Sequence, residues 1–230
     1  MLAFLAALVV FVLAHVVPAR PGLRGRLVGW LGQRTYQALY SALSLALLAW
    51  LISAAIRAPE IVIWEPARWQ GVLALIVVPL ALTLIFAGLI KPNPLSVSLS
   101  TKGYDPARPG LLAITRHPVL WGFSLWGGAH VAANGDLVGI ILFGVLTLFA
   151  LIGTKILDRR KARLLGDEEW RRLAAHTANA PFVAVLQGRA RPGIDRPLLI
   201  GITAAVFASA ILLAGGHLWL FGADPLTFWR

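Results

Sequence analysis

A small set of ionisable side chains could do chemistry within the apolar stretches of this chain. His15, His130 and His217 lie inside long apolar stretches, and Arg116-His117 stands directly before another. An ionisable group inside a bilayer is costly, so each of these residues is a candidate for function. None of the apolar stretches holds a central Asp or Glu, which argues against a carboxylate proton relay or a transporter built on acidic ligands.

Two imidazoles that face each other across a helical bundle are the minimum for six-coordinate haem. Neutral nitrogen ligands bind the iron from both sides while the macrocycle fills an apolar slot. Cysteine is absent, which excludes thiolate-ligated haem, iron–sulfur clusters and cysteine-ligated zinc. Small residues precede His130, and they permit either such a slot or plain close packing of helices. These are Gly122, Gly127, Gly128 and Ala129. From the residues alone, haem is one option among several.

The elements that must position these side chains are membrane helices. The 230 residues are 58% hydrophobic and only 13% charged, with a mean hydropathy of +0.77, against about 25% charged in an ordinary soluble domain. The sequence therefore predicts an all-α helical bundle in the lipid bilayer, a single domain over residues 1–230, with about six spans. The expected spans cover residues 1–17, 36–56, 69–90, 118–133, 137–156 and 197–221. The turn Asn134-Gly135-Asp136 makes the fourth and fifth an antiparallel hairpin.

The charges of the loops between the expected spans predict the orientation of the chain in the membrane. Residues 18–35 hold four bases and no acid, residues 91–116 hold four bases and one acid, and residues 158–196 hold nine bases and five acids. The positive-inside rule puts these loops in the cytoplasm and both chain ends in the periplasm. The net charge of +11 is thus a membrane signal, and nucleic acid is not an expected partner. His15 and His117 fall near cytoplasmic ends, and His130 lies about 20 Å beyond His117 at 1.5 Å per residue.

An extended pattern of residues lies around the fourth span. It reads Thr115-Arg116-His117-Pro118-Val119-Leu120-Trp121-Gly122, then Ala129-His130, then Ala133-Asn134-Gly135-Asp136. This pattern resembles the NnrU family of bacterial membrane proteins. Further similarities are the early His15, Asn93-Pro94 and the run Asp158-Arg159-Arg160. The resemblance covers residues 1 to about 181 and leaves the last span, 197–221, outside it.

The NnrU resemblance implies a haem protein of the bacterial inner membrane. The family includes the zeta-carotene isomerases, which convert a cis double bond of a polyene to trans, and bacterial members are associated with nitrite and nitric oxide metabolism. The resemblance makes His15 and His130 the axial ligands of haem b, and it gives His117 and Arg116 catalytic roles. It places His117, Trp121 and Asn134 beside the cofactor. A hydrophobic small molecule, nitric oxide and denitrification proteins are the partners it implies.

Two alternatives of other classes stay open. The chain is more distantly similar to isoprenylcysteine carboxyl methyltransferases, which share an Arg-His-Pro and a downstream Glu-Glu pair on a helix, here Glu168-Glu169 on a helix capped by Asp167. That similarity implies an S-adenosylmethionine-dependent membrane methyltransferase using Arg116, His117 and Glu169, although the tyrosines expected downstream are missing. The third possibility is a non-enzymatic accessory factor of denitrification, because the spans hold no obvious catalytic acid or base.

Overall fold

The computed structural model describes residues 1–18 and 20–229 and is helical, which confirms the predicted all-α class. None of the described residues belongs to a strand; an isolated antiparallel bridge joins Val62 and Asp136. The chain divides into two compact units. Unit 1 comprises Met1–Ile63 and Asp136–Val138, and unit 2 comprises Trp64–Gly135 and Gly139–Arg230. The expectation of a single domain stays a prediction.

Unit 1 holds three helices. α1 spans Leu2–Val16, α2 spans Pro21–Leu31 and α3 spans Gln33–Ile56, and both α1 and α2 pack against α3. Phe4, Ala7 and Leu8 are buried, as expected for residues at i, i+3 and i+4, which share one helix face. α2 lies within residues 18–35, which the sequence predicts as a loop because arginines and glycines interrupt the apolar pattern there.

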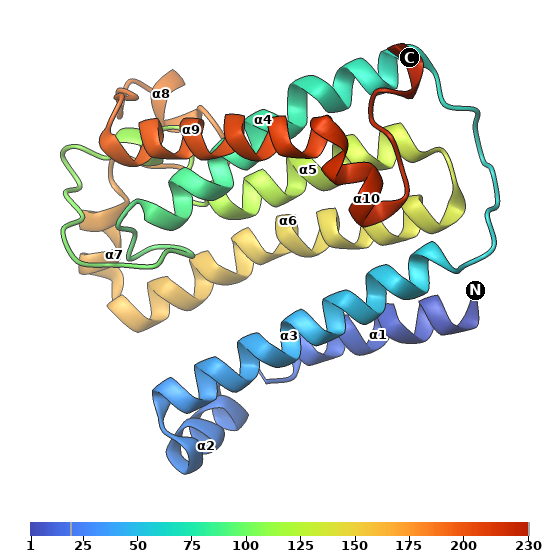
Figure 1. Cartoon of the computed structure of the whole chain (residues 1–230). Coiled ribbons are helices and arrows are strands. Elements are labelled where there is room, and N and C mark those ends of the chain that lie inside the picture. The colour runs from blue at the N-terminus through green and yellow to red at the C-terminus, as the bar shows by residue number, and fades with distance from the viewer. Residues whose placement is uncertain (19, 230) are drawn as a thin grey trace. The chain divides into compact units, whose positions relative to one another are not determined.

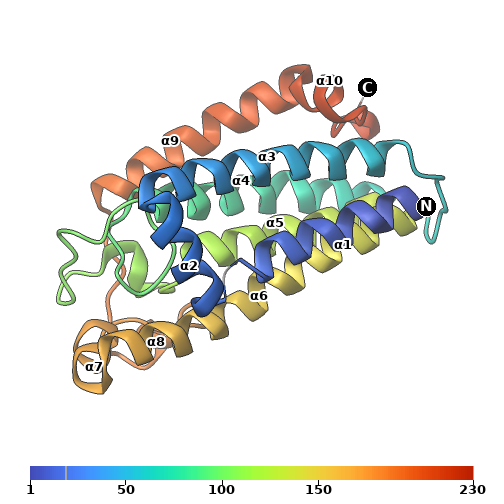
Figure 2. The ribbon, with the colours of Figure 1, turned by 90° about the horizontal axis from the view of Figure 1, so that it is seen from below.

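Unit 2 contains the remaining helices. The long ones are α4 (Arg68–Ile90), α5 (Pro118–Asn134), α6 (Leu137–Leu165, from Gly139 onward in unit 2) and α9 (Arg196–Ile211). A π-helical turn, Leu212–Gly216, links α9 to α10 (His217–Phe221). The short helices α7 (Asp167–Ala174) and α8 (Val183–Leu186) lie at one end of the unit, beside the loop 91–117 (Figures 1 and 2).

α4 is the central helix of unit 2 because it packs against both α5 and α9. A glycine at each of these two helix contacts lets the backbones come close together. A Cβ at Gly201 of α9 would lie 2.6 Å from the backbone nitrogen of Ala87, and a Cβ at Gly122 of α5 would lie 2.7 Å from the carbonyl oxygen of Ala81. Small residues at such crossings are typical of membrane helices, whose association depends on close packing. Gly122 thus serves helix packing.

The helices account for all six predicted spans in position, and for four of them in length. Four are long and apolar enough to cross a membrane, which confirms a multi-pass membrane protein. These are Gln33–Ile56, Arg68–Ile90, Leu137–Leu165 and Arg196–Phe221. α1 has 15 residues and α5 has 17, so the count of six stays a prediction.

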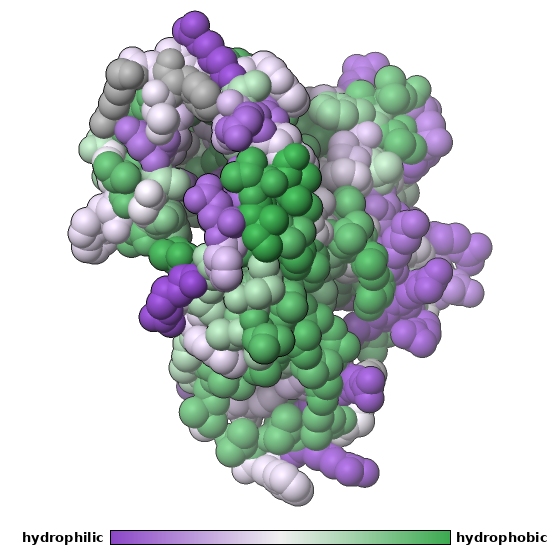
Figure 3. All heavy atoms as spheres, turned by 90° about the vertical axis from the view of Figure 1, so that its right-hand side faces the viewer, coloured by the Kyte–Doolittle hydropathy of each residue, from purple (hydrophilic) through white to green (hydrophobic). Residues whose placement is uncertain are grey.

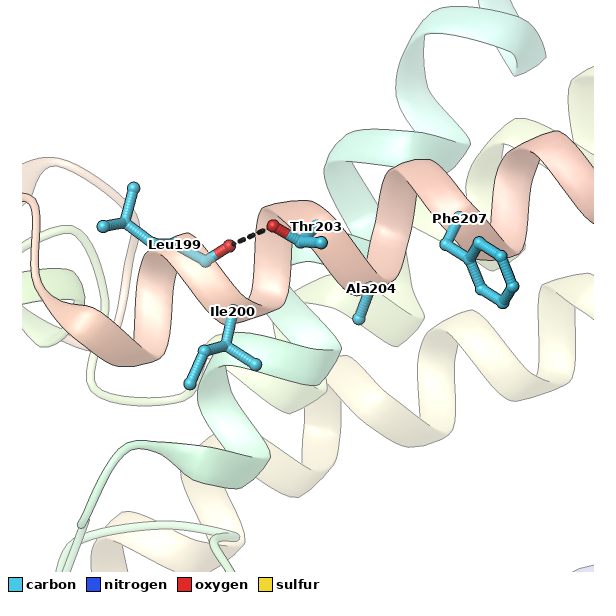
Figure 4. A pocket seen from close by; sticks show the side chains of 5 residues that line it. All are labelled: Leu199, Ile200, Thr203, Ala204 and Phe207. Carbon is cyan, nitrogen blue, oxygen red and sulfur yellow. Dashed lines mark hydrogen bonds between the residues drawn. The ribbon is translucent and has the colours of Figure 1, made fainter.

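Much of the exposed surface is apolar, as a lipid-facing surface must be (Figure 3). The outer face of α9 is an example: it carries a shallow apolar hollow lined by Leu199, Ile200, Thr203, Ala204 and Phe207 (Figure 4). The Thr203 hydroxyl donates to the carbonyl oxygen of Leu199 within the same helix, at 3.1 Å. With its polar group satisfied internally, this face suits hydrocarbon.

Candidate functional site

A cluster of polar side chains lies at one end of unit 2, where the loop 91–117, the C-terminal part of α6 and the segment 174–195 meet. We call it the polar cluster, and it consists of Ser96, Arg116, His117, Asp158 and Asn179. The backbone hydrogen bond from Arg116 N to Ala178 O, 2.9 Å, confirms that two of the predicted basic loops lie on the same side of the bundle.

His117 is the centre of the polar cluster and is fully buried. Its Nε2 lies 2.8 Å from Oδ1 of Asp158, and its Nδ1 lies 2.7 Å from the Ser96 hydroxyl. Because the carboxylate only accepts, Nε2 carries the proton, and in the neutral ring Nδ1 accepts from Ser96. Both ring nitrogens are therefore engaged inside the protein.

Asp158 accepts hydrogen bonds from three side chains, of which His117 is the first. Arg116 donates from Nε to Oδ1 at 2.9 Å and from Nη2 to Oδ2 at 3.2 Å, and Asn179 donates from Nδ2 to Oδ2 at 2.8 Å. Such a two-pronged Arg–carboxylate pair is among the strongest charge-assisted contacts. The pair balances one positive charge with one negative charge in a largely buried place, so the cluster is electrically neutral when His117 is neutral.

Further bonds tie the cluster to its surroundings. Asn93 donates from Nδ2 to the carbonyl oxygen of Arg116 at 2.9 Å, and Thr115 donates from Oγ1 to that of Asn179 at 2.7 Å. Trp121, which the family resemblance places beside a cofactor, donates from Nε1 to the same Asn179 carbonyl at 2.9 Å. These contacts join segments far apart in sequence, so the polar cluster holds this end of the bundle together.

The aromatic neighbours of the cluster belong to the loop and to α7. Trp170 lies beneath the Arg116 guanidinium, 5.2 Å from the ring centroid. The Tyr104 hydroxyl donates to the carbonyl oxygen of Leu173 at 3.0 Å. Burial raises the pKa of Tyr104 to about 12; Arg116 opposes this shift and Asp105 adds to it. Tyr104 is thus a neutral hydrogen-bond donor at physiological pH.

The opposite end of α5 carries His130 in a different environment. Its Nδ1 lies 2.8 Å from the carbonyl oxygen of Trp126, one turn earlier. The rings of Trp126 and Phe143 approach within 4.8 and 4.7 Å between centroids. Asn134, another residue that the resemblance places near a cofactor, donates from Nδ2 to the carbonyl oxygen of His130 at 2.7 Å. Asn134 thus provides a hydrogen-bond donor for one of the backbone carbonyl groups in the last turn of α5.

His217 of α10 is a neighbour of His130 to which the family resemblance assigns no role. The two rings lie 6.4 Å apart between centroids, at an interplanar angle of 22°. Nδ1 of His217 lies 2.8 Å from the carbonyl oxygen of Ala223. Nothing in the local sequence of either histidine signals this proximity, because α5 and α10 are more than eighty residues apart.

His15 lies near the C-terminal end of α1 in unit 1. Its Nδ1 lies 2.7 Å from the carbonyl oxygen of Phe11, and the ring of Tyr40 meets it edge-on at 6.0 Å between centroids. His15 and His130 thus share one local arrangement, an Nδ1 bond to the carbonyl four residues earlier. A carbonyl only accepts, so the proton is on Nδ1 and the neutral ring keeps its lone pair on Nε2.

The small residues before His130 have separate uses. A Cβ at Gly127 would collide with the Thr147 hydroxyl and lie 3.1 Å from the carbonyl oxygen of Phe143, so Gly127 brings α5 close to α6. A Cβ at Gly128 would meet nothing within 4 Å. The Thr147 hydroxyl is buried and has no hydrogen-bond partner in the described part of the chain. Of these glycines, only Gly128 leaves open space.

The donor set fits haem better than it fits a bare metal ion. Among residues 1–18 and 20–229 no group of three or more His, Asp or Glu side chains is placed to hold a metal ion. Haem needs only two protein nitrogens, and a ligating histidine normally donates its other N–H to a backbone carbonyl or a carboxylate. His15 and His130 both meet that condition.

α7 differs in detail from its prediction. Its N-cap is Gly166, with φ of +78°, and Asp167 is its first residue, so the predicted cap at Asp167 was wrong. Gly166 adopts this backbone conformation without a steric penalty. Glu169, the residue that the methyltransferase alternative needs, pairs with Arg172 through two bonds of 2.7 Å on the exposed side of the helix.

Comparison with models of protein families shows to which family the chain belongs. The model for NnrU protein matches residues 3–225, nearly the whole chain. The chain belongs to the NnrU family. The match includes α9 and α10, so the NnrU region extends beyond the limit near residue 181 drawn from the sequence. Neither a curated protein nor a solved structure matches the chain.

Proposed function

We propose that this NnrU-family protein is a b-type haem protein of the bacterial inner membrane, with His15 and His130 as the axial ligands. The observation that carries the proposal is the shared state of the two rings. Each donates Nδ1–H to the carbonyl four residues earlier, which is the bond that a haem-ligating histidine normally makes with the nitrogen that does not bind iron. The family resemblance selects the same two histidines independently of this geometry.

The surroundings of His130 support a large apolar cofactor. Nε2 of His130 has no hydrogen-bond partner among the described residues, and its ring is flanked by Trp126 and Phe143. An aromatic environment favours a porphyrin over a hydrated cation.

His117 and Arg116 are positioning residues in this proposal. Their nitrogens are occupied by Ser96, Asp158 and Thr177, so they fix the N-terminal end of α5. His130 lies thirteen residues further along the continuous helix Pro118–Asn134, so this anchor stabilises the bundle without contacting the proposed ligand.

The proposed activity is cis–trans isomerisation of a hydrophobic polyene. Haem bound by these residues would supply an iron centre able to polarise a double bond or to bind a small ligand such as nitric oxide. The chain's own residues hold the cofactor, exclude water with aromatic rings, and offer an apolar exterior from which a lipid-soluble substrate enters.

The test is the haem content of the full-length protein, purified in detergent after expression with added haem precursor. We expect a Soret band in the wild type, and a loss of most of it in His15→Ala and in His130→Ala. His176→Ala is the matched control, because His176 also bonds a backbone carbonyl through Nδ1 but lies in an exposed loop. A wild type without a Soret band would overturn the proposal, and so would a band that survives both ligand substitutions.

A second readout separates cofactor binding from activity. Haem-loaded wild type in lipid vesicles is offered a cis-polyene, and the trans product is measured by its absorption shift. Turnover lost in His130→Ala supports the isomerase. Haem binding without turnover of any offered polyene, together with a spectral shift on adding nitric oxide, would replace isomerisation by nitric oxide binding.

The methyltransferase alternative has less support. Arg116 and His117 make internal bonds, and Glu169 is paired with Arg172, so none of the three is left to hold S-adenosylmethionine. Micromolar binding of S-adenosylmethionine by calorimetry, lost on changing His117, would favour that alternative.

A further inference from the structure

A cavity of about 630 Å³ opens at the same end of unit 2 as the polar cluster. Its walls come from the loop 91–117 and from the segment between α8 and α9. The lining residues that matter for its chemistry are Lys91, Arg108, His176, Arg189, Arg191 and Asp195. The volume suits a small polar molecule or the headgroup of a lipid.

The cavity is strongly basic. Four of the described residues that line it are Lys or Arg, and Asp195 is the acidic one among them. Asp195 is already engaged: its Oδ2 lies 2.8 Å from Nζ of Lys91, and its Oδ1 accepts from the backbone N–H of Leu198 at the start of α9. Asp195 therefore does not neutralise the arginines. Arg108 is paired with Asp105 on the exposed surface, Nε to Oδ2 at 2.9 Å, so Arg189 and Arg191 contribute most of the positive potential inside.

Arg189 is held in a fixed position on the cavity wall. Its Nη1 donates to the carbonyl oxygens of Ala175 and Thr177, at 2.6 and 3.1 Å, and its Nε donates to Gln187 at 2.8 Å. In the described part of the chain its Nη2 has no such bond. A guanidinium oriented in advance is suited to phosphate oxygens, which it binds with geometric specificity.

Gly110 lies in the loop that forms one wall of the cavity, where the backbone passes close to Asp195 and Lys91. Its φ is +59°, and a Cβ at this position would collide with the carboxylate of Asp195 and lie 3.1 Å from Nζ of Lys91. Only glycine therefore lets the loop close over the Lys91–Asp195 pair. The pair links the end of α4 to the start of α9, so the cavity floor is anchored on two membrane helices.

We propose that this cavity binds a phosphate ester, with Arg189 as its anchor and Arg108 and Arg191 as the cations at the rim. The ligand is either the headgroup of an anionic phospholipid or a soluble phosphorylated molecule, and the shared chemistry is a phosphate group. The cavity lies between loops at the end of a membrane bundle, where both sources have access. The proposal does not depend on haem.

The experiment compares two double charge reversals in the full chain. Arg108→Glu/Arg191→Glu changes the rim, where both side chains are exposed. Lys102→Glu/Arg163→Glu is the matched control, with the same change in net charge at exposed positions outside the cavity lining. Size-exclusion profiles and thermal unfolding establish that both variants fold.

Two arms distinguish the sources of phosphate. Native mass spectrometry of protein purified from vesicles of phosphatidylcholine with phosphatidic acid counts retained phosphatidic acid, with diacylglycerol as the probe that lacks phosphate. Calorimetry in phosphatidylcholine nanodiscs measures binding of glycerol 3-phosphate. In whichever arm binds, we expect the rim variant to weaken binding at least about tenfold, because each basic residue near a membrane surface contributes about fivefold to binding of an anion.

The two arms and the control variant together give four possible results. Retention of phosphatidic acid lost in the rim variant assigns the cavity to a lipid headgroup, and calorimetric binding lost in the rim variant assigns it to a soluble phosphate ester. Equal weakening in the rim and control variants would overturn the proposal, because it would show a general charge effect. Binding of neither probe to the wild type would overturn it as well.

Discussion

A histidine lies at each end of α5, and the two histidines differ in their hydrogen-bond partners. At the N-terminal end His117 is fully buried, and both of its ring nitrogens bond to other side chains, Ser96 and Asp158. At the C-terminal end His130 bonds through Nδ1 to its own helix and is otherwise surrounded by rings. This comparison indicates that the role of a membrane histidine follows from what its second ring nitrogen, the one beyond the first hydrogen bond, is bonded to.

A histidine with two side-chain partners holds structure, whereas one with a single backbone partner keeps a lone pair for a ligand. The comparison therefore assigns stability to the His117 end and cofactor binding to the His130 end. Each of the following changes tests one side of that assignment.

The largest expected effect on stability is at Asp158. Asp158→Ala removes the carboxylate shared by Arg116, His117 and Asn179, and it leaves the Arg116 charge unpaired in a largely buried place. We expect a loss of about 3 kcal/mol of stability, measured by thermal unfolding in detergent. Haem bound per folded molecule stays near the wild-type value.

The matched control for Asp158 is Glu169→Ala, which breaks an exposed pair with Arg172. We expect little change in its unfolding temperature, because exposed ion pairs contribute little. Equal destabilisation by both substitutions would contradict the assignment of stability to the polar cluster.

An intermediate effect is expected where α5 approaches α6 near His130. Gly127→Ala puts a Cβ against the Thr147 hydroxyl and the Phe143 backbone, and overpacking of this kind costs about 1–3 kcal/mol. The displaced Phe143 ring also disturbs His130, so we expect a shifted Soret band. Gly128→Ala is the control with open space around it, and we expect it to be neutral or to add up to about 1 kcal/mol of stability. A Soret shift in Gly128→Ala but not in Gly127→Ala would reverse this interpretation.

The smallest effect is expected at the edge of the polar cluster. Tyr104→Phe removes the hydrogen bond to the Leu173 carbonyl and costs about 1 kcal/mol of stability, measured by thermal unfolding. The raised pKa of Tyr104, about 12, means that folding favours the neutral phenol. This contribution is fully present below pH 10 and is lost as the pH rises toward 12. Unfolding temperatures of wild type and Tyr104→Phe that differ equally at pH 8 and pH 11.5 would contradict it.

The helices could be predicted because membrane helices have a strong local signal. Apolar runs bounded by charge, proline or the Asn134-Gly135 turn gave α4 and α5 to within one residue. α2 was not foreseen, since its arginines and glycines interrupt the apolar pattern. α6 continues nine residues past the predicted end at 156, because Asp158 and the bases after it extend the helix beyond the apolar segment.

The candidate site could be predicted only in part. Arg116 and His117 stood out from their own sequence, but Ser96, Asp158 and Asn179 come from three other segments, and only folding brings them together. One signal was present: Asp158 is an acid at the head of a strongly basic loop, which is where a partner for Arg116 was to be sought. The neighbour of His130, His217, had no comparable signal.

The most direct test of the account is a haem titration of haem-free full-length protein, followed by absorption at the Soret wavelength. Wild type, His117→Gln and His130→Ala are compared at equal concentrations of folded protein. We expect His117→Gln to bind haem as the wild type does, and His130→Ala to bind little. Loss of binding in His117→Gln, with full binding in His130→Ala, would contradict it.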